Sequence, residues 1–236
     1  MAIWAIVPAA GVGSRLGGPV PKQYLPLLGR TVVERSIDCL LALAGVTRVV
    51  VAIGADDVYW QKLPMAQHPR VTVVTGGSER QTSVLNALRS ILAEANSDDW
   101  VLVHDAVRPC VKSDDINNLI HRVKDDEVGG LLAATMDNTV KRAKKGELSI
   151  RVAETLDRTH LYSALTPQMF RVEKLFNALS EAAEQNAPIT DEASAMERMG
   201  WAPLLVEGCK TNIKITHSSD LLLAEAILNN SQQPKG

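Results

Sequence analysis

Hydrophobic runs alternate with amphipathic segments along most of the chain. Short apolar runs predict strands over 2–8, 47–54, 70–75, 99–104 and 129–135. Between them, apolar positions at helical spacing predict helices over 31–44, 57–66, 79–94 and 114–124. Strands that alternate with helices are typical of βαβ units around a mostly parallel sheet that is buried on both faces. We therefore expect an α/β fold, a single Rossmann-like domain with a mostly parallel twisted sheet and helices on both faces.

This alternation breaks near Asp137. Residues 139–155 show a shorter alternation around Lys144-Lys145-Gly146, which predicts a polar hairpin that projects from the sheet. A hairpin with few core residues needs a surface to lie on. The hairpin is therefore either a plain surface loop or a contact with a partner subunit.

The C-terminal part returns to helices and short strands. The pattern predicts helices near 172–186, 191–199 and 218–229, and strands near 203–207 and 211–215. We expect one domain over 1–230, which includes the arm at about 137–158. The last residues, 231–236, are polar and are expected to form a disordered tail.

Composition narrows the class of protein. The 236 residues are 46% hydrophobic and 22% charged, with a net charge of −2, so no broad basic field is available for nucleic acid. No apolar run is long enough to cross a membrane. The three cysteines, Cys39, Cys110 and Cys209, have no metal or disulfide spacing, which favours buried thiols over a reactive one. The chain opens on a strand without a basic leader, so we expect a mature cytoplasmic protein.

The segment from Pro8 to Leu25 carries the strongest chemical signal. It follows the first predicted strand and holds four glycines together with Arg15 and Lys22. Glycines allow close approach to a ligand, and successive backbone N–H groups in such a loop bind anions. The segment therefore predicts a loop that holds a polyphosphate and stabilises charge that develops on it.

Two other glycine motifs fit this loop less well. A dinucleotide fingerprint would need glycine at position 16, where Leu16 stands, and an acidic residue about 20 positions later. The P-loop pattern G-x-x-x-x-G-K-[ST] is absent. An ordinary connector remains the plain alternative, although a connector has no need of two cations among its glycines and prolines.

Two more segments lie at predicted strand ends, where open α/β sheets bind ligands. In Thr75–Ser83, Gly77 permits close contact with a flat base and Ser83 offers a donor, but a structural Gly-Gly turn explains the segment equally well. Asp105 follows the run V-L-V-H and is well placed to hold Mg²⁺ beside phosphates, or else caps the next segment. Arg108 can pair with Asp105 or brace the loop.

For the polar residues later in the chain, a functional role and a purely structural role both remain open. Thr139 and Arg158 flank the hairpin, and Thr166 lies in an L-T-P-Q segment. Thr190 is a candidate helix N-cap in I-T-D-E-A-S, and Lys214 in N-I-K-I-T can be a solvated charge on an edge strand.

Taken together, the motifs resemble a known family. A-A-G-x-G-x-R, P-K-Q-Y-L, V-H-D-A-x-R-P, L-T-P-Q, I-T-D-E-A-S and N-I-K-I-T occur in this order. The chain resembles, from Ile3 to about Ile227, the 2-C-methyl-D-erythritol 4-phosphate cytidylyltransferases of the non-mevalonate route to isoprenoid precursors. The first loop alone would indicate only the wider nucleotidyltransferase group.

The resemblance implies a function and a site. It implies transfer of CMP from CTP to 2-C-methyl-D-erythritol 4-phosphate with Mg²⁺, and a homodimer interlocked by the β-arm. By the same resemblance, Arg15 and Lys22 stabilise the α-phosphate. The nucleotide contacts that it implies are Ala10, Gly11, Gly77, Ser83, Asp105 and Ala106, with Asp105 beside the metal. The substrate contacts are Thr139 and Arg158 from the partner's arm, and Thr166, Thr190 and Lys214.

Three other activities remain as alternatives. The sister reaction on ribitol 5-phosphate has the same fold and CTP chemistry, and the segments around Thr139, Arg158 and 189–194 favour methylerythritol phosphate. A catalytically inactive nucleotide-binding module is disfavoured because Arg15, Lys22 and Asp105 are all present. An NAD-dependent oxidoreductase is disfavoured by the misplaced third glycine.

Overall fold

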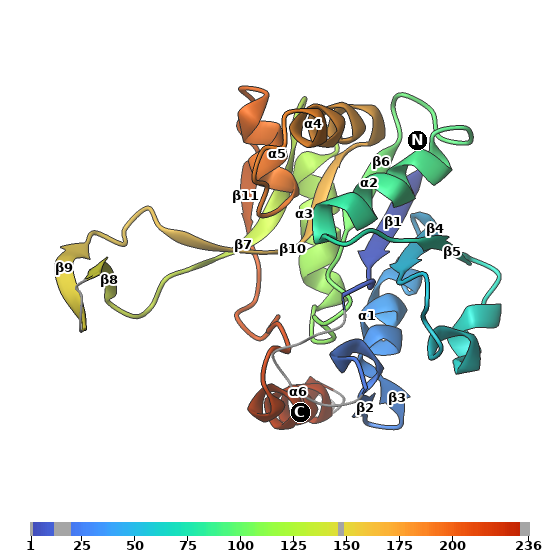
Figure 1. Ribbon diagram of the computed structural model, residues 1–236, viewed down its shortest axis with the longest axis horizontal. Helices are drawn as coiled ribbons and strands as arrows, with labels where there is room; N and C mark the ends of the chain where they lie inside the picture. The colour runs from blue at the N-terminus through green and yellow to red at the C-terminus, as the bar shows by residue number, and fades with distance from the viewer. Residues whose placement is uncertain (1, 12–19, 146–148, 232–236) are drawn as a thin grey trace.

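A seven-stranded sheet forms the centre of the molecule, in the order β11-β7-β10-β6-β1-β4-β5 (Figure 1). The computed structural model describes residues 2–11, 20–145 and 149–231. The strands of this sheet are β1 (Ile3–Pro8), β4 (Val46–Ile53), β5 (Val71–Thr75), β6 (Trp100–Val103), β7 (Gly129–Thr135), β10 (Tyr162–Arg171) and β11 (Leu204–Glu207). Strand β10 is antiparallel to both of its neighbours, and the other pairs are parallel. The predicted α/β fold with a mostly parallel sheet is confirmed.

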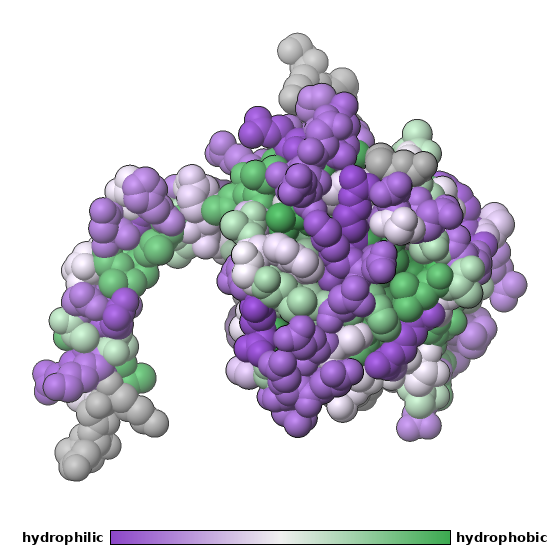
Figure 2. Space-filling model, turned by 90° about the horizontal axis from the view of Figure 1, so that it is seen from above, coloured by the Kyte–Doolittle hydropathy of each residue, from purple (hydrophilic) through white to green (hydrophobic). Residues whose placement is uncertain are grey.

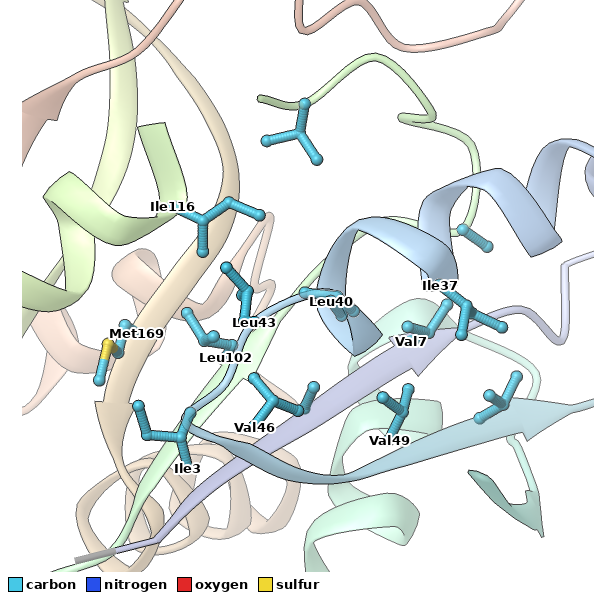
Figure 3. Close-up of a cluster of buried hydrophobic side chains, with 14 of the residues drawn as sticks. Ile3, Val7, Ile37, Leu40, Leu43, Val46, Val49, Leu102, Ile116 and Met169 are labelled. Carbon is cyan, nitrogen blue, oxygen red and sulfur yellow. The ribbon is translucent and has the colours of Figure 1, made fainter. Parts of the chain in front are cut away.

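Helices cover both faces of this sheet. The side chains of β1 alternate: Trp4 and Ile6 enter one hydrophobic cluster, while Ala5 and Val7 enter the other. The first cluster includes residues of α2 (Arg80–Ile91), α4 (Val172–Glu184) and α5 (Glu192–Arg198). The second, shown in Figure 3, includes residues of α1 (Val32–Leu41) and α3 (Ser113–Val123). Because both faces are buried, the strands read as continuous apolar runs.

A third, smaller cluster attaches the C-terminal helix. Helix α6 (Ser218–Ser231) packs beside the short hairpin of β2 (Pro26–Leu27) and β3 (Arg30–Thr31). Buried Leu27 and Ala224 meet there with Val107 and Ile215, which lie in loops near the carboxyl edge of the sheet. The cluster therefore holds the C-terminal helix and the β2–β3 hairpin against that edge.

The predicted hairpin is confirmed as an arm that projects from the body. Strands β8 (Val140–Lys145) and β9 (Ile150–Leu156) form a separate two-stranded antiparallel sheet. Figures 1 and 2 show it standing well away from the rest of the molecule, and in Figure 2 hydrophobic residues lie among hydrophilic ones along it. Ile150 and Val152 on this arm are 78% and 64% exposed, so the arm presents apolar surface that its own chain leaves uncovered.

One strand was missed, and two expected elements were wrong. Strand β10 was not expected, and it fills the gap between β6 and β7. The helix expected over 57–66 is instead two short 3₁₀ turns, η3 (Trp60–Lys62) and η4 (Pro64–Gln67), because Pro64 interrupts it. The segment 211–215 contains no strand; its backbone hydrogen-bonds to side chains and to a neighbouring loop.

Ser231 is the last residue of α6, so the predicted tail begins inside the helix, and residues 232–236 lie outside the described part. Among the described helices, none is both long and apolar enough to cross a membrane. All three cysteines are free thiols; Cys110 is buried, whereas Cys39 and Cys209 are half-buried.

Candidate active site

A pocket of about 390 Å³ opens at the carboxyl edge of the sheet. The chain runs outward from β1 to β4 and β5, and then returns to place β6 on the other side of β1. The strand order therefore reverses between β1 and β6, where open α/β sheets bind their ligands. The pocket is lined by the residues after β1, after β6 and before α2: Pro8–Gly11, Asp105–Val107 and Gly77–Arg80, together with Lys22, Gln23, Ser83 and Lys214.

The first loop is closed by a glutamine. Gln23 is buried, and its side-chain amide donates to the carbonyls of Ala9 (2.9 Å) and Gly11 (2.8 Å). It thereby ties the end of the loop to its beginning. The short helix η2 (Lys22–Tyr24) places Lys22 on the pocket wall, where its Nζ donates to the carbonyl of Ile215 at 3.1 Å. Residues 12–19, which include Arg15, lie outside the described part of the chain.

The Gly-Gly turn after β5 needs both glycines. A Cβ on Gly76 would lie 2.6 Å from the Cβ of Ala10, and a Cβ on Gly77 would lie 2.4 Å from the Cγ2 of Thr82. The hydroxyl of Ser83 is buried and accepts from the backbone N–H of Gly77 at 3.0 Å. Ser83 therefore braces the turn, and Gly76 brings the turn against the start of the first loop.

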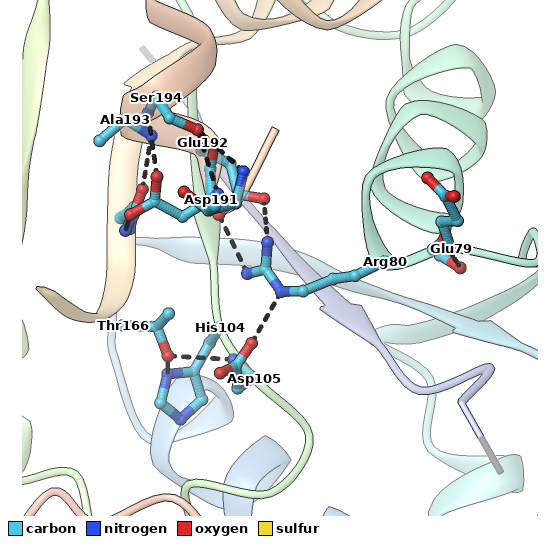
Figure 4. A network of polar contacts seen from close by, with 12 residues as sticks. Glu79, Arg80, His104, Asp105, Thr166, Asp191, Glu192, Ala193 and Ser194 are labelled. Carbon is cyan, nitrogen blue, oxygen red and sulfur yellow. Dashed lines mark hydrogen bonds and ion pairs between the residues drawn. The ribbon is translucent and has the colours of Figure 1, made fainter. Parts of the chain in front are cut away.

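Asp105 is the centre of the charge network in this pocket, and Figure 4 shows its contact with Arg80. Its Oδ1 accepts from Arg80 at 2.9 Å, and its Oδ2 accepts from Lys214 at 2.9 Å and from Arg108 at 3.4 Å. Burial alone would raise the pKa of Asp105, but these three cations hold it far below its ordinary value. Asp105 is therefore a carboxylate at every physiological pH.

Behind Asp105 lies a neutral imidazole. His104 is fully buried, with Nε2 3.1 Å from the carbonyl of Arg108 and Nδ1 3.0 Å from Thr166 Oγ1. A carbonyl can only accept, so the proton is on Nε2 and the Thr166 hydroxyl donates to Nδ1. Thr166 Oγ1 in turn accepts from the backbone N–H of Asp105 at 3.1 Å. Burial lowers the pKa of His104 to about 4, in agreement with this neutral state.

The I-T-D-E-A-S segment begins α5, but its cap is not the one expected. Asp191 accepts from the backbone N–H of Ser194 at 2.9 Å and Ser194 bonds back to it, which forms a capping box. Thr190 is exposed one residue before this cap, so its expected role as the N-cap is wrong. Gln168 of β10 bonds both Asp191 (2.9 Å) and the N–H of Ala193 (2.8 Å).

The N-I-K-I-T segment passes over the same site as an irregular strap. Arg108 donates to the Asn212 carbonyl at 2.7 Å, and the Asn212 amide donates to the Thr166 carbonyl at 2.7 Å. The N–H of Ile215 bonds the Val107 carbonyl at 2.9 Å. Because these backbone groups bond to residues around the pocket, they are not paired in a strand ladder. Lys214 turns inward to Asp105 and does not lie on an edge strand.

Thr139 and Arg158 are not brought to this pocket by their own chain. Both are exposed at the base of the arm, and Arg158 donates to the Met136 carbonyl at 3.1 Å. Neither residue lines the pocket.

Comparisons with known proteins identify the family of this chain. Residues 3–230 match the model of the family described as IspD, 2-C-methyl-D-erythritol 4-phosphate cytidylyltransferase. The chain belongs to this family. A member from Vibrio vulnificus (strain CMCP6) is 49% identical over 231 residues, which are 98% of this chain and 96% of that protein. One from Pseudomonas fluorescens (strain SBW25) is 50% identical over 221 residues, 93% of each protein.

Solved structures of this cytidylyltransferase family share the fold. The crystal structure of the Francisella tularensis 2-C-methyl-D-erythritol 4-phosphate cytidylyltransferase matches with a TM-score of 0.81 at 35% identity, over 96% of this chain and 100% of that chain. A crystal structure of 4-diphosphocytidyl-2C-methyl-D-erythritol synthase matches with a TM-score of 0.83 at 34% identity, over 97% of this chain and 100% of that chain.

The donor set of the cytidylyltransferase pocket limits how a metal can bind. Asp105 is a carboxylate on its wall, and both of its oxygens already accept from cations. Among the described residues, no group of three or more His, Cys, Asp or Glu side chains is placed to hold a metal. Mg²⁺ is commonly bound by one or two carboxylates together with substrate phosphates. A Mg²⁺ in this pocket would therefore have to be held mainly by the phosphates of a bound nucleotide, with Asp105 on the pocket wall as its candidate protein ligand.

Sequence reasoning found most of the pocket residues of this family member but missed the ones that connect them. Lys22, Gly77, Ser83, Asp105, Ala106 and Lys214 are brought together as expected. The links through Gln23, Arg80, Gln168 and Glu192 were not expected, although all four lie within quoted motifs or next to them. The sequence does hint at these links: each is made by a long polar side chain in a motif whose other residues had already been given a role.

Proposed function

We propose that the chain transfers the cytidylyl group of CTP to the phosphate of 2-C-methyl-D-erythritol 4-phosphate, giving CDP-methylerythritol and pyrophosphate. Membership of the family over residues 3–230 supports the reaction. The observation in this chain that best supports the proposal is the pocket at the point where the strand order reverses. There Lys22 lies on the wall, and Arg80 and Lys214 hold one buried carboxylate, Asp105. A cytoplasmic location stays a prediction of the sequence.

The chemistry needs positioned positive charge more than it needs proton transfer. An oxygen of the acceptor phosphate forms a bond to the α-phosphorus of CTP, and the bond from that phosphorus to the bridging oxygen breaks. The bonding electrons leave with pyrophosphate. Because the attacking group is already an oxyanion, no general base is required. The barrier arises from repulsion between anions and from charge that grows on the phosphates, which preorganised cations relieve.

The residues of the pocket suit these roles. Lys22 is a point charge at the end of the first loop, and Arg15 would add planar recognition of several phosphate oxygens. The N-terminus of α2 faces the same space, and helix N-termini attract phosphates. Bound with the nucleotide, Mg²⁺ would act there as a Lewis acid on the phosphate oxygens, held in part by Asp105.

The acceptor and the nucleotide take different parts of the site in this proposal. Ala10, Gly11, Gly77, Ser83 and Ala106 line the pocket and would form its nucleotide part. Backbone contacts near Gly77, too close for a purine, would select a pyrimidine. The acceptor part would be formed by Lys214 on the pocket wall, by Thr166 and Thr190, which lie outside the pocket lining of this structure, and by Thr139 and Arg158 from the arm of a second copy. The exposed apolar residues of the arm support such a homodimer.

Release of pyrophosphate tests the reaction directly. The purified chain is incubated with Mg²⁺ and CTP, and then with methylerythritol phosphate or ribitol 5-phosphate as the acceptor. We expect release with methylerythritol phosphate, little release with ribitol 5-phosphate, and little when ATP replaces CTP. Faster release with ribitol 5-phosphate would instead assign the sister activity, and no release with either acceptor would overturn the proposed transfer.

A further inference from the structure

Arg80 joins two acidic side chains that lie on different elements. At the start of α2, its Nε donates to Asp105 Oδ1 at 2.9 Å. Its two terminal nitrogens donate to the two carboxylate oxygens of Glu192, at 2.6 and 3.0 Å. Figure 4 shows the guanidinium lying between the two carboxylates, with Glu192 on α5 and Asp105 beyond β6.

Both carboxylates depend on this guanidinium. Glu192 is 1% exposed and Asp105 is 5% exposed, so water solvates neither charge well. A two-point pair between guanidinium and carboxylate fixes the plane of both groups. Once Glu192 holds the two terminal nitrogens of Arg80, the Nε–H can point only along one direction, and that direction meets Asp105.

The orientation of Asp105 then decides where the other cations lie. With Oδ1 held by Arg80, Oδ2 faces Lys214 at 2.9 Å and Arg108 at 3.4 Å. Lys214 lines the pocket in which the phosphates are proposed to react. A chain of contacts therefore runs from Glu192 through Arg80 and Asp105 to a cation of the site.

We propose that Glu192, acting through Arg80, is a positioning residue of the nucleotidyl transfer. It fixes the Asp105 carboxylate and thereby the positive groups beside the reacting phosphates. This inference rests on the proposed function, and it goes beyond that function because Glu192 itself does not line the pocket. It gives the I-T-D-E-A-S segment a role in the electrostatics of the site, distinct from contact with the acceptor.

A purely structural role for Glu192 is less well supported by its surroundings. The start of α5 is already capped by Asp191 and Ser194, and Gln168 clamps the same turn. Ala195 and Met196 bury the other side of the helix in the hydrophobic cluster. The helix therefore has its cap and its packing without the carboxylate of Glu192.

Single variants of Glu192 and Arg80 are the first test of this link. Glu192→Gln keeps the size of the side chain but removes one acceptor and the charge, so Arg80 is no longer held at two points. We expect kcat/KM to fall about 10-fold, the scale for removing a partner that orients a site residue. Arg80→Lys keeps the charge but cannot bridge two carboxylates, and it should give a similar loss. Glu197→Gln, a change at an exposed position of the same helix, is the matched control and should leave kcat/KM unchanged.

The deciding measurement repeats Glu192→Gln in an Asp105→Asn background. If Glu192 acts through Asp105, adding Glu192→Gln to Asp105→Asn should lower kcat/KM by less than about 2-fold, because the effects of coupled residues are not additive. The dissociation constant for CTP with Mg²⁺ is also measured for the wild type, the two single variants and the double variant. The four proteins can then be compared even where turnover is slow. A structural role would leave the 10-fold loss in place in both backgrounds, with a lower melting temperature.

Two results would overturn the positioning role, and they differ from failure of the proposed function. If Glu192→Gln turned over at the wild-type rate, the inference would be refuted while the function stands. Equal losses from Glu192→Gln in the wild-type and Asp105→Asn backgrounds would also refute it. If the wild-type chain itself releases no pyrophosphate from CTP and the acceptor, the proposed function fails first.

Discussion

His104 shows what burial does to a single titratable group. Its ring is enclosed between Thr166 and the Arg108 carbonyl, and burial lowers its pKa from 6.5 to about 4. Between these two pH values the unfolded chain binds a proton that the folded chain does not. The free energy of unfolding therefore falls as the pH falls from about 6.5 to 4, by up to about 3 kcal/mol for a difference of this size.

Urea unfolding at pH 7.5 and pH 5 measures this dependence. His104→Gln removes the titrating ring, so the loss of stability between the two pH values should become smaller than in the wild type. His121→Gln, at an exposed position of α3, is the control and should keep the wild-type loss. An unchanged pH dependence in His104→Gln would show that other groups set it.

Lys22 is the described cation that ends the first loop, and its ammonium is held at the carbonyl of Ile215. We expect Lys22→Ala to lower kcat by about 10²-fold or more, the scale for removing one donor to charge in the transition state. Steady-state release of pyrophosphate measures it. Lys62→Ala, at an exposed position of another 3₁₀ turn, is the control, and a near-normal kcat in Lys22→Ala would contradict the role.

Residues of the site differ in how far sequence could predict them. Lys22 and Asp105 were found because charged residues beside glycines or at strand ends have few structural reasons to be there. Arg80 and Glu192 are 112 positions apart, and no local pattern relates them. Such a pair is defined only when β6, α2 and α5 have been packed together, so its assignment needs the structure.

At the scale of elements, the start of α5 is set by Asp191. Its side chain accepts from the Ser194 N–H and also from the Gln168 amide. Asp191→Ala should lower the free energy of unfolding by about 1–2 kcal/mol, as the loss of an N-cap does. Chemical denaturation of the purified protein measures this change.

Thr190→Ala is the matched control for the cap. Thr190 is exposed, and its backbone N–H rather than its side chain is bonded to Ser194. We expect no change in stability beyond about 0.5 kcal/mol for this surface position. A larger loss in Thr190→Ala than in Asp191→Ala would restore Thr190 as the cap.

Elements were predictable where the pattern is regular and were missed where it is interrupted. The parallel strands were found because burial on both faces makes them continuous apolar runs. Strand β10 contains Pro167, and its register against β7 shifts between Ala164 and Gln168. A strand interrupted by proline at an irregularity shows neither an apolar run nor a clean alternation. The motif residues Thr166 and Gln168 lie at this irregularity, beside the site.

At the scale of the whole molecule, the site of one chain is incomplete in our proposal. Figure 1 shows the arm standing away from the body of its own chain. Thr139 and Arg158 lie at the base of this arm, and neither lines the pocket of its own chain. The arm exposes Ile150 and Val152, which a second copy would cover. In a two-fold symmetric dimer, each arm would serve the pocket of the other chain.

Mixed dimers of two inactive variants test this sharing. One subunit carries Lys22→Ala and the other carries Arg158→Ala, each with a different affinity tag. If Arg158 acts across the dimer, one of the two pockets receives both wild-type residues and the other receives neither. The doubly purified heterodimer should then turn over at about half the wild-type rate, because one of two symmetric sites is intact.

The two arrangements predict opposite results, which makes the experiment decisive. If Arg158 served its own pocket, each site of the heterodimer would lack one residue, and the rate would stay near that of the single variants. Homodimers of each variant, purified with the same two tags, give the baseline. Pyrophosphate release no faster than that baseline, in heterodimers shown to be intact by mass, would rule out an active site shared through the arm.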